Sequence, residues 1–130
     1  MYRAVTRKIE VKVTPRFVKE RSSPSNGYYF WAYTIDITNL GSEAVQLKTR
    51  HWRITDSLGR LQEVKGPGVV GEEPVLKPGE SFEYTSGVPL PTPSGFMVGS
   101  YGMITGEGEP FDIEIPAFSL DSSYAERTIN

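Results

Sequence analysis

The feature of this sequence that most constrains its fold is a series of short segments in which apolar and polar residues alternate, separated by glycine- and proline-rich turns. The segments recur about every ten residues, and no stretch has the sustained spacing of an amphipathic helix. Because successive side chains of a strand point to opposite faces, this alternation predicts strands that each bury one face. We therefore expect an all-β protein.

The segment from Tyr28 to Ile37 is the richest in aromatic and β-branched residues, which predicts a central strand of the core. Its alternate residues form one apolar face: Tyr29, Trp31, Tyr33, Ile35 and Ile37. The next segment, from Val45 to Asp56, changes the phase of its alternation halfway along. We expect a β-bulge near Thr49-Arg50-His51, because one extra residue would let both halves face inward.

Further strands are expected over residues 8–18, 61–64, 81–86, 96–105 and 110–120. Lys77-Pro78-Gly79-Glu80 predicts a type II turn, since proline and glycine occupy its two central positions. Prolines at every second position predict a stiff connector from Val88 to Gly95. Residues 122–130 are polar and are expected to fray.

The length of 130 residues suits one domain with one core, spanning residues 1–130. Seven or eight short antiparallel strands with long crossing connections predict a two-sheet sandwich. A closed barrel is the alternative architecture.

The composition narrows the surroundings and partners of the chain. With no cysteine, the fold can use neither disulfides nor thiolate metal sites, and we expect a cytoplasmic protein. The longest apolar runs are too short to cross a bilayer, and the N-terminus lacks a secretory pattern, so no membrane insertion is expected. The net charge of −2 gives no general attraction to nucleic acid, and none is expected as a partner. Basic residues gather in residues 1–21 and acidic ones in residues 100–130, where neighbouring terminal strands would let them offset.

The sequence offers few groups for catalysis or metal binding. His51 is the only histidine, so multi-histidine metal sites are excluded and a serine nucleophile would have one possible base. No Gly-x-Ser-x-Gly elbow is present, and His51 is interpreted as a structural or surface residue at the bulge. The acidic pairs Glu72/Glu73 and Glu107/Glu109 fall in loops and are interpreted as solvated. We therefore expect no catalytic residue, no metal site and no cofactor.

One glycine motif is a candidate ligand-binding site. Gly66, Gly68 and Gly71 match the spacing of the dinucleotide fingerprint, but Glu72-Glu73-Pro74 follows instead of a helix. The favoured interpretation is a loop that needs positive φ angles or close backbone approach. The alternative is an anion-binding loop assisted by Lys65 or Lys77, the nearby cations.

The chain resembles the ApaG family, also called CorD, through six blocks that cover almost its whole length. They are Arg50-His51-Trp52-Arg53-Ile54-Thr55-Asp56, Gly66-Pro67-Gly68-Val69-Val70-Gly71-Glu72-Glu73-Pro74, Leu76-Lys77-Pro78-Gly79-Glu80, Tyr84-Thr85-Ser86-Gly87, Gly95-Phe96-Met97-Val98-Gly99-Ser100-Tyr101 and Ile115-Pro116-Ala117-Phe118-Ser119-Leu120. Glu73 departs from the family pattern, in which glutamine is expected there. The resemblance implies an immunoglobulin-like or fibronectin type III-like sandwich and a link to cobalt resistance and magnesium efflux. It implies protein binding for related domains in F-box proteins and a polymerase-interacting protein, and it carries over no catalytic residue.

Our leading functional hypothesis is a non-catalytic protein-interaction module. Tyr28 and Phe30 lie on the strand face opposite the core residues, and an exposed aromatic patch there would form a docking site for an unidentified protein. Burial of that face would make it ordinary core. The alternative hypothesis is a binder of a phosphorylated compound or a divalent cation at the loop from Gly66 to Gly71. Exposed edge strands leave both a monomer and a dimer open.

Overall fold

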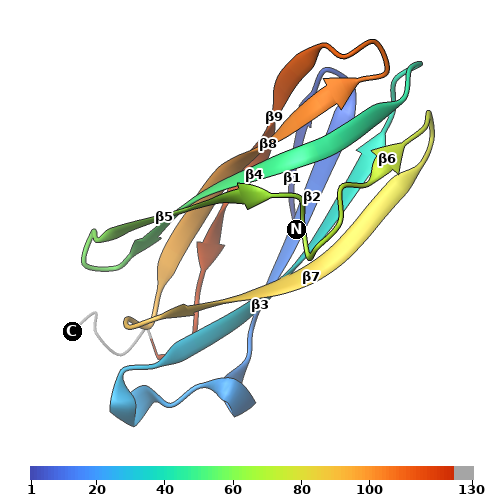
Figure 1. Ribbon diagram of the computed structural model, residues 1–130. Helices are drawn as coiled ribbons and strands as arrows, with labels where there is room; N and C mark the ends of the chain where they lie inside the picture. Colours follow the sequence, from blue (N-terminus) through green and yellow to red (C-terminus); the bar gives the residue numbers. More distant parts are fainter. Residues whose placement is uncertain (125–130) are drawn as a thin grey trace.

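The computed structural model describes residues 1–124 and consists of two antiparallel sheets packed face to face (Figure 1). The all-β sandwich predicted from the alternation is confirmed. The elements, in chain order, are β1 (Tyr2–Thr6), β2 (Ile9–Phe17), η1 (Lys19–Arg21), η2 (Pro24–Asn26), β3 (Tyr29–Asn39), β4 (Val45–Asp56), β5 (Leu61–Pro67), β6 (Val75–Leu76), β7 (Ser81–Leu90), β8 (Gly95–Thr105) and β9 (Pro110–Leu120).

The chain crosses repeatedly between the two sheets. One sheet has the strand order β1-β2-β3-β7 and the other β5-β4-β8-β9, with the two-residue β6 also paired to β4. Consecutive strands β3 and β4 therefore lie in different sheets, and β7 returns to the first sheet after β4, β5 and β6 have joined the second. This crossing places β5 and β7 at edges of their sheets, where neither has a second neighbour among the described strands.

Strand β3 is central, as its composition predicted. It pairs with β2 on one side and β7 on the other, and its inward residues Trp31, Tyr33, Ile35 and Ile37 are buried. Burial of such large apolar side chains is the main stabilising contribution to a fold without disulfides. The indole Nε1 of Trp31 also donates a hydrogen bond of 2.8 Å to the Asp121 carbonyl, which fixes the end of the described chain against the core.

The predicted change of phase in β4 is produced by a bulge. The pairing of β4 with β8 shifts between Leu47 and Thr49, so Lys48 is the extra residue, one position before the predicted site. As a result Leu47 and Trp52, which have opposite parity in the sequence, are both buried. The same shift turns Arg50 toward the interior side of the sheet, together with Trp52 and Ile54.

The two sheets are joined along one side by β1 and β9. The Glu114 amide of β9 donates a hydrogen bond of 3.1 Å to the Thr6 hydroxyl of β1, and the Ser119 amide donates one of 3.3 Å to the Tyr2 hydroxyl. Beside them, Arg7 and Glu109 form an ion pair of 3.2 Å. The basic N-terminal strand and the acidic C-terminal strand thus lie together.

Two segments differ from expectation. The predicted connector from Val88 to Gly95 is shorter than expected, because β7 continues to Leu90 and pairs Val88 with Trp31. Pro89 pairs with Phe30 of β3. The Phe30 amide donates to the Ser22 hydroxyl and its carbonyl accepts from the Val18 amide, so neither group is directed at Pro89. The nitrogen of Pro89 therefore lies at the free edge of the sheet, where proline is tolerated. Of the predicted frayed tail, residues 125–130 lie outside the described residues, whereas Ser122 donates a hydrogen bond of 2.6 Å to the Pro93 carbonyl.

Candidate functional site: a pocket between the edges of the two sheets

The candidate site is a pocket of about 320 Å³ on the side of the sandwich opposite β1 and β9. It lies between the edge strands β5 and β7, which are separated in Figure 1. Side chains from both sheets and from the glycine loop (residues 66–72) surround it: Tyr33, Arg50, Trp52, Ile54, Gln62, Val64, Val69, Val70, Tyr84, Ser86, Gly87, Val88 and Pro89. The pocket therefore combines an apolar floor with a few polar groups, as small-molecule sites do.

Arg50 supplies the positive charge of this pocket. Its Nη1 donates hydrogen bonds of 2.8 Å to the Pro67 carbonyl and 3.0 Å to the Gly68 carbonyl. Among the described residues no carboxylate forms an ion pair with it. The guanidinium is thus held by two neutral carbonyls, and its charge is not neutralised within residues 1–124.

Gly66 makes room for this guanidinium. The residue faces Arg50 across the β4–β5 pair, and a Cβ atom built on it would lie 3.1 Å from the Cζ, Nη1 and Nη2 atoms of Arg50. Three nearly equal distances mean that the flat guanidinium lies over the glycine. The first glycine of the motif therefore serves close approach of a side chain, one of the two roles expected for the loop.

Three tyrosines lie beside Arg50 and form the inner part of the site. The Tyr84 and Tyr101 hydroxyls are hydrogen bonded to each other, one from each sheet. Burial raises the pKa of Tyr33, Tyr84 and Tyr101, and the Arg50 charge opposes this effect at all three hydroxyls. The positive field of Arg50 therefore extends into the space between the sheets.

The rest of the glycine loop closes on itself as a tight hairpin. The Val69 amide donates to the Glu72 carbonyl at 2.8 Å, and the Glu72 amide donates to the Val69 carbonyl at 2.9 Å. The two residues between them, Val70 and Gly71, have φ angles of 43° and 81°, as in a type I′ turn. Gly68 has a φ of 59°, and a Cβ there would come within 2.3 Å of the Glu72 carbonyl oxygen. The expected need for positive φ angles is confirmed.

Three amides of this loop are hydrogen bonded within the protein. Besides those of Val69 and Glu72, the Gly68 amide donates a hydrogen bond of 2.8 Å to the Lys48 carbonyl. The neighbouring Glu73 carboxylate pairs with Lys48 at 2.6 Å. These bonds shape the loop, and the structure directs two of its carbonyls at Arg50.

The two lysines suggested by the sequence do not join this pocket. Lys65 faces the outer surface of β5 beside His51, its partner across the strand pair, and Lys77 lies in the turn before β7. The cation that the structure places there is Arg50, which the sequence analysis did not select. The signal was present in the motif Arg50-His51-Trp52, because Arg50 and Trp52 have the same parity, but the bulge at Lys48 decides which face is inward.

His51 lies on the outer face of β4. Its Nε2 is 2.6 Å from the Glu63 Oε2, and among the described residues it forms no hydrogen bond to a serine. The carboxyl of Glu63 has a lowered pKa, chiefly because of its hydrogen bond with His51. Within residues 1–124 there is no cluster of three or more histidine, aspartate or glutamate side chains arranged to hold a metal ion. The same part of the chain contains no helix long and apolar enough to cross a membrane.

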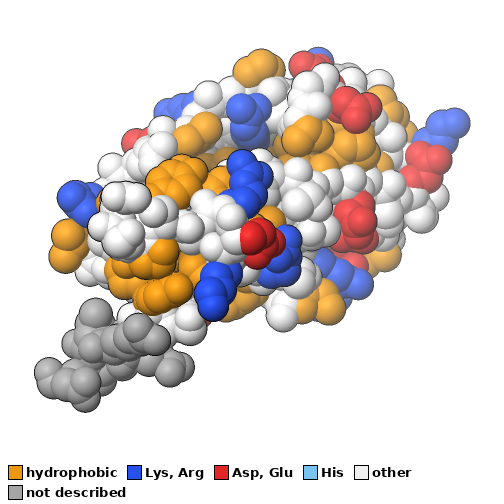
Figure 2. Space-filling model, turned by 90° about the horizontal axis from the view of Figure 1, so that it is seen from below, with side chains coloured by type: hydrophobic (Ala, Val, Ile, Leu, Met, Phe, Trp, Pro, Cys, Tyr) orange, Lys and Arg blue, Asp and Glu red, His pale blue; other side chains and the backbone are white. Residues whose placement is uncertain are grey.

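The aromatic pair of Tyr28, just before β3, and Phe30, within it, is partly covered. Tyr28 keeps 41% of its surface exposed, while Phe30 is half-buried beneath Arg21, whose Cζ lies 4.3 Å from the ring centre. A Cβ on Gly87 of the neighbouring strand would come within 2.3 Å of the Phe30 ring, so the ring also fills the space over that glycine. Figure 2, which views the molecule from below, shows hydrophobic side chains in clusters with both acidic and basic side chains between them.

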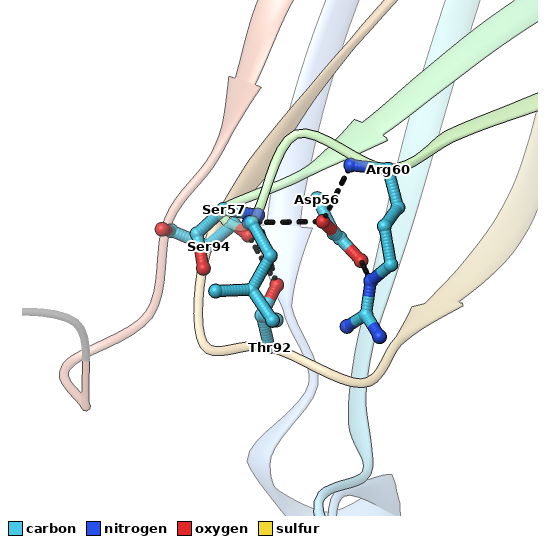
Figure 3. A network of polar contacts seen from close by, with 6 residues as sticks. Asp56, Ser57, Arg60, Thr92 and Ser94 are labelled. Carbon is cyan, nitrogen blue, oxygen red and sulfur yellow. Dashed lines mark hydrogen bonds and ion pairs between the residues drawn. The ribbon is translucent and has the colours of Figure 1, made fainter.

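A polar network around Asp56 lies at the end of β4, on the side of the sandwich that carries the edge strands β5 and β7 (Figure 3). The carboxylate accepts hydrogen bonds from the Leu58 and Arg60 amides at 2.9 and 3.0 Å and pairs with the Arg60 side chain at 2.7 Å. The next amide, that of Ser57, donates to the Thr92 hydroxyl at 3.1 Å, and this hydroxyl donates to the Ser94 carbonyl. The network therefore links the β4–β5 hairpin to the β7–β8 hairpin.

The fold and pocket define a small β-sandwich domain with a hollow between two sheet edges, and comparisons with known proteins agree with this class. The ApaG domain model matches residues 19–105. The chain belongs to the ApaG family, as its sequence blocks indicated. It is 65% identical to Protein ApaG of Rhodopseudomonas palustris and 61% identical to Protein ApaG of Rhodospirillum centenum, over 130 residues that cover 100% of each chain.

A solved structure shows the same fold. The crystal structure of the putative ApaA protein from Bordetella pertussis is similar with a TM-score of 0.86 and 53% sequence identity. The similarity covers 88% of this chain and 94% of that one.

Proposed function

We propose that this ApaG protein is a non-catalytic binding domain that holds a small ligand in the pocket between β5 and β7. The observation that carries the proposal is the Arg50 guanidinium, which lies in that pocket without an acidic partner among the described residues. The two carbonyl contacts leave the Nε and Nη2 donors of this half-buried cation without a partner among the described residues, and a ligand could supply one. This hypothesis keeps the small-ligand alternative from the sequence and moves its centre from the lysines to Arg50.

The dimensions and lining of the pocket support this function. Its volume of about 320 Å³ is near the lower end of the range of about 300–1,000 Å³ that is usual for ligand pockets. Trp52, Val64 and Val88 provide apolar surface, while Arg50 and Ser86 provide polar groups at separate points. Such a lining suits a compact molecule with an apolar body and one polar end.

Blocking the pocket tests the proposal. Ser86 faces the pocket, whereas its neighbour Thr85 is exposed on the outer face of β7, so Ser86→Phe fills the site and Thr85→Phe is the matched control. We expect some members of a set of small neutral and anionic aromatic compounds to shift the amide NMR signals of Val69 and Val88 saturably in the wild type and in Thr85→Phe. Ser86→Phe should lose those shifts. Retention of the shifts in a folded Ser86→Phe variant, or flat titrations of the wild type, would contradict the proposal.

Protein docking at Tyr28 and Phe30 is a second candidate function. The 41% exposure of Tyr28 favours it, because exposed aromatic residues are enriched at binding sites, although Phe30 is partly occupied with Arg21 and Gly87. In this hypothesis the Tyr28→Ala and Phe30→Ala variants lose a partner that the folded wild type retains in affinity capture. Equal recovery by all three proteins would argue against docking at this face.

The absence of catalysis and the links to cobalt resistance and magnesium efflux remain parts of the proposal. His51 is engaged with Glu63, while Glu10, Asp56 and Glu73 are each paired with a cation. These pairings support a structural role for the four side chains and thus a non-catalytic domain. A cytoplasmic location and the choice between monomer and dimer likewise remain proposals.

A further inference from the structure

We propose that the group recognised in the pocket is an oxyanion, a carboxylate or a phosphate, bound by the Nε–H and Nη2–H donors of Arg50. This inference rests on the proposed binding function and names the chemical class of its ligand. It assigns recognition to one edge of one side chain and gives the glycine loop the role of positioning that edge.

The hydrogen bonds of Arg50 determine which edge is available. Both carbonyl contacts, to Pro67 and Gly68, are made by Nη1. The remaining donors, on Nε and Nη2, point in parallel from one side of the planar group, which is the arrangement that binds two oxygens of a carboxylate or phosphate together. Neither atom has a hydrogen-bond partner within residues 1–124, and neither is an unsatisfied buried atom, so each keeps some exposed surface.

The guanidinium is held in place before any ligand arrives. Gly66 lies under its flat face, and the two carbonyls fix its Nη1 end. Those carbonyls are themselves held, because the Gly68 amide is bonded to Lys48 and the Val69–Glu72 hairpin closes directly after it. A donor group that is already ordered loses less conformational entropy on binding, so this arrangement favours affinity.

The residues around Arg50 favour a ligand that carries a negative charge on an apolar body. The positive field of Arg50 reaches the buried tyrosine hydroxyls, while Glu73, which follows the glycine loop, is paired with Lys48. Partial burial weakens the screening of a charge by water, which strengthens a contact between oppositely charged groups. Next to Arg50 the pocket continues over Trp52 and Val88, which can contact an aromatic or aliphatic body.

Three probe molecules of similar shape separate the effect of the anionic group from that of the apolar ring. Benzoate carries a carboxylate, phenyl phosphate carries a phosphate, and benzyl alcohol is neutral. The variants are Arg50→Lys, which keeps the charge and loses the paired donors, Arg50→Gln, which loses both, and Gly66→Ala, which keeps Arg50 and disturbs its position. Arg53→Gln is the matched control, since Arg53 lies on the same strand and faces the outer surface.

Dissociation constants come from NMR titrations of the Val69 and Val88 amides. We expect at least one anionic probe to bind the wild type at least about tenfold more tightly than benzyl alcohol, with a loss of about tenfold or more in Arg50→Lys and Arg50→Gln. Gly66→Ala should bind the anionic probe more weakly than the wild type, and Arg53→Gln should bind it with an unchanged dissociation constant. The stronger of the two anions identifies whether carboxylate or phosphate is preferred.

Other results separate the two levels of the proposal. If benzyl alcohol binds as tightly as both anions and the Arg50 variants are unaffected, the pocket still binds small molecules and oxyanion recognition is wrong. If Arg50→Lys binds like the wild type, recognition by paired donors is likewise wrong. If no probe of the larger aromatic set shifts the pocket amides, the binding function itself is overturned.

Discussion

At the scale of single residues, Val70 holds a conformation that its side chain disfavours. Its φ angle of 43° is in the left-handed region, where a branched Cβ crowds the backbone, and 56% of its surface is exposed. The strain is therefore not offset by burial in the core. It persists because the hydrogen bonds between Val69 and Glu72 close the turn around it.

Val70→Asn should stabilise the protein, because Asn-Gly is the preferred pair in a type I′ turn. We expect a gain of roughly 1 kcal/mol in the free energy of unfolding, measured by urea denaturation. Val70→Ala is the control, since it keeps a Cβ and lacks the local hydrogen-bonding capacity of asparagine. The explanation by backbone strain would be rejected if neither variant were more stable than the wild type.

The residues of the candidate site were only partly predictable. The glycine spacing indicated a loop with positive φ angles, and Gly68 and Gly71 have them. Selection of Arg50 needed two facts that the sequence alone does not contain, the position of the bulge at Lys48 and the pairing of Arg50 with Gly66. Contacts between strands depend on register, whereas the alternation of one strand indicates only its two faces.

At the scale of elements, the Asp56 network is a connection between two hairpins whose strength depends on charge. Burial alone would raise the pKa of the Asp56 carboxyl, but hydrogen bonds from Arg60 and Leu58 outweigh it and lower the pKa below its ordinary value. The folded state therefore favours the carboxylate. Its contribution to stability is present above the ordinary pKa of an aspartate, about 3.9, and is lost as pH falls through the lowered value.

Asp56→Asn should be less stable than the wild type at neutral pH, because the amide neither carries the charge that pairs with Arg60 nor accepts as strongly. The difference should shrink as pH falls below about 4, where the carboxyl of the unfolded chain takes up its proton, and should be lost once pH falls through the lowered pKa of the folded state. Urea denaturation across this pH range measures it, with the exposed Asp112→Asn as control. A difference in stability that does not change with pH would show that charge is not the cause.

Several elements could be predicted from the sequence because their local patterns and tertiary environment agree. Strand β4 has the predicted bounds, and β3 has the predicted inward face. Strand β1 was not predicted as a separate strand, and its pairing depends on a tight turn at Arg7 and Lys8, two non-glycine residues with positive φ. The extension of β7 through Pro89 was also not predicted, since it requires knowing that β7 is an edge strand.

At the scale of the whole molecule, the bonded Tyr84 and Tyr101 hydroxyls connect the two sheets through the core. Burial raises the pKa of both, and of Tyr33 nearby, so the folded state keeps their protons to higher pH than an unfolded chain does. Their raised pKa values therefore leave stability unaffected below the ordinary tyrosine pKa of about 10 and reduce it progressively above that pH.

An alkaline titration should show this dependence. We expect Tyr33, Tyr84 and Tyr101, of the seven tyrosines, to ionise in a late step that coincides with loss of the β-sheet circular dichroism signal. Tyrosinate absorbance follows the ionisation, and the Tyr84→Phe variant should reduce the amplitude of the late step. Complete ionisation of all tyrosines while the sheet signal is intact would contradict the expectation.

The two sheets are bonded to each other along the side formed by β1 and β9, and at one end of the opposite side through the network around Asp56. Hydrogen bonds join β1 to β9, and the Arg7–Glu109 ion pair lies beside them, whereas β5 and β7 are edge strands that do not pair with each other. Moving β5 away from β7 breaks no strand pairing, because the two strands belong to different sheets. A ligand that enters the pocket between these two edges therefore has no strand pairing to break on its way to Arg50.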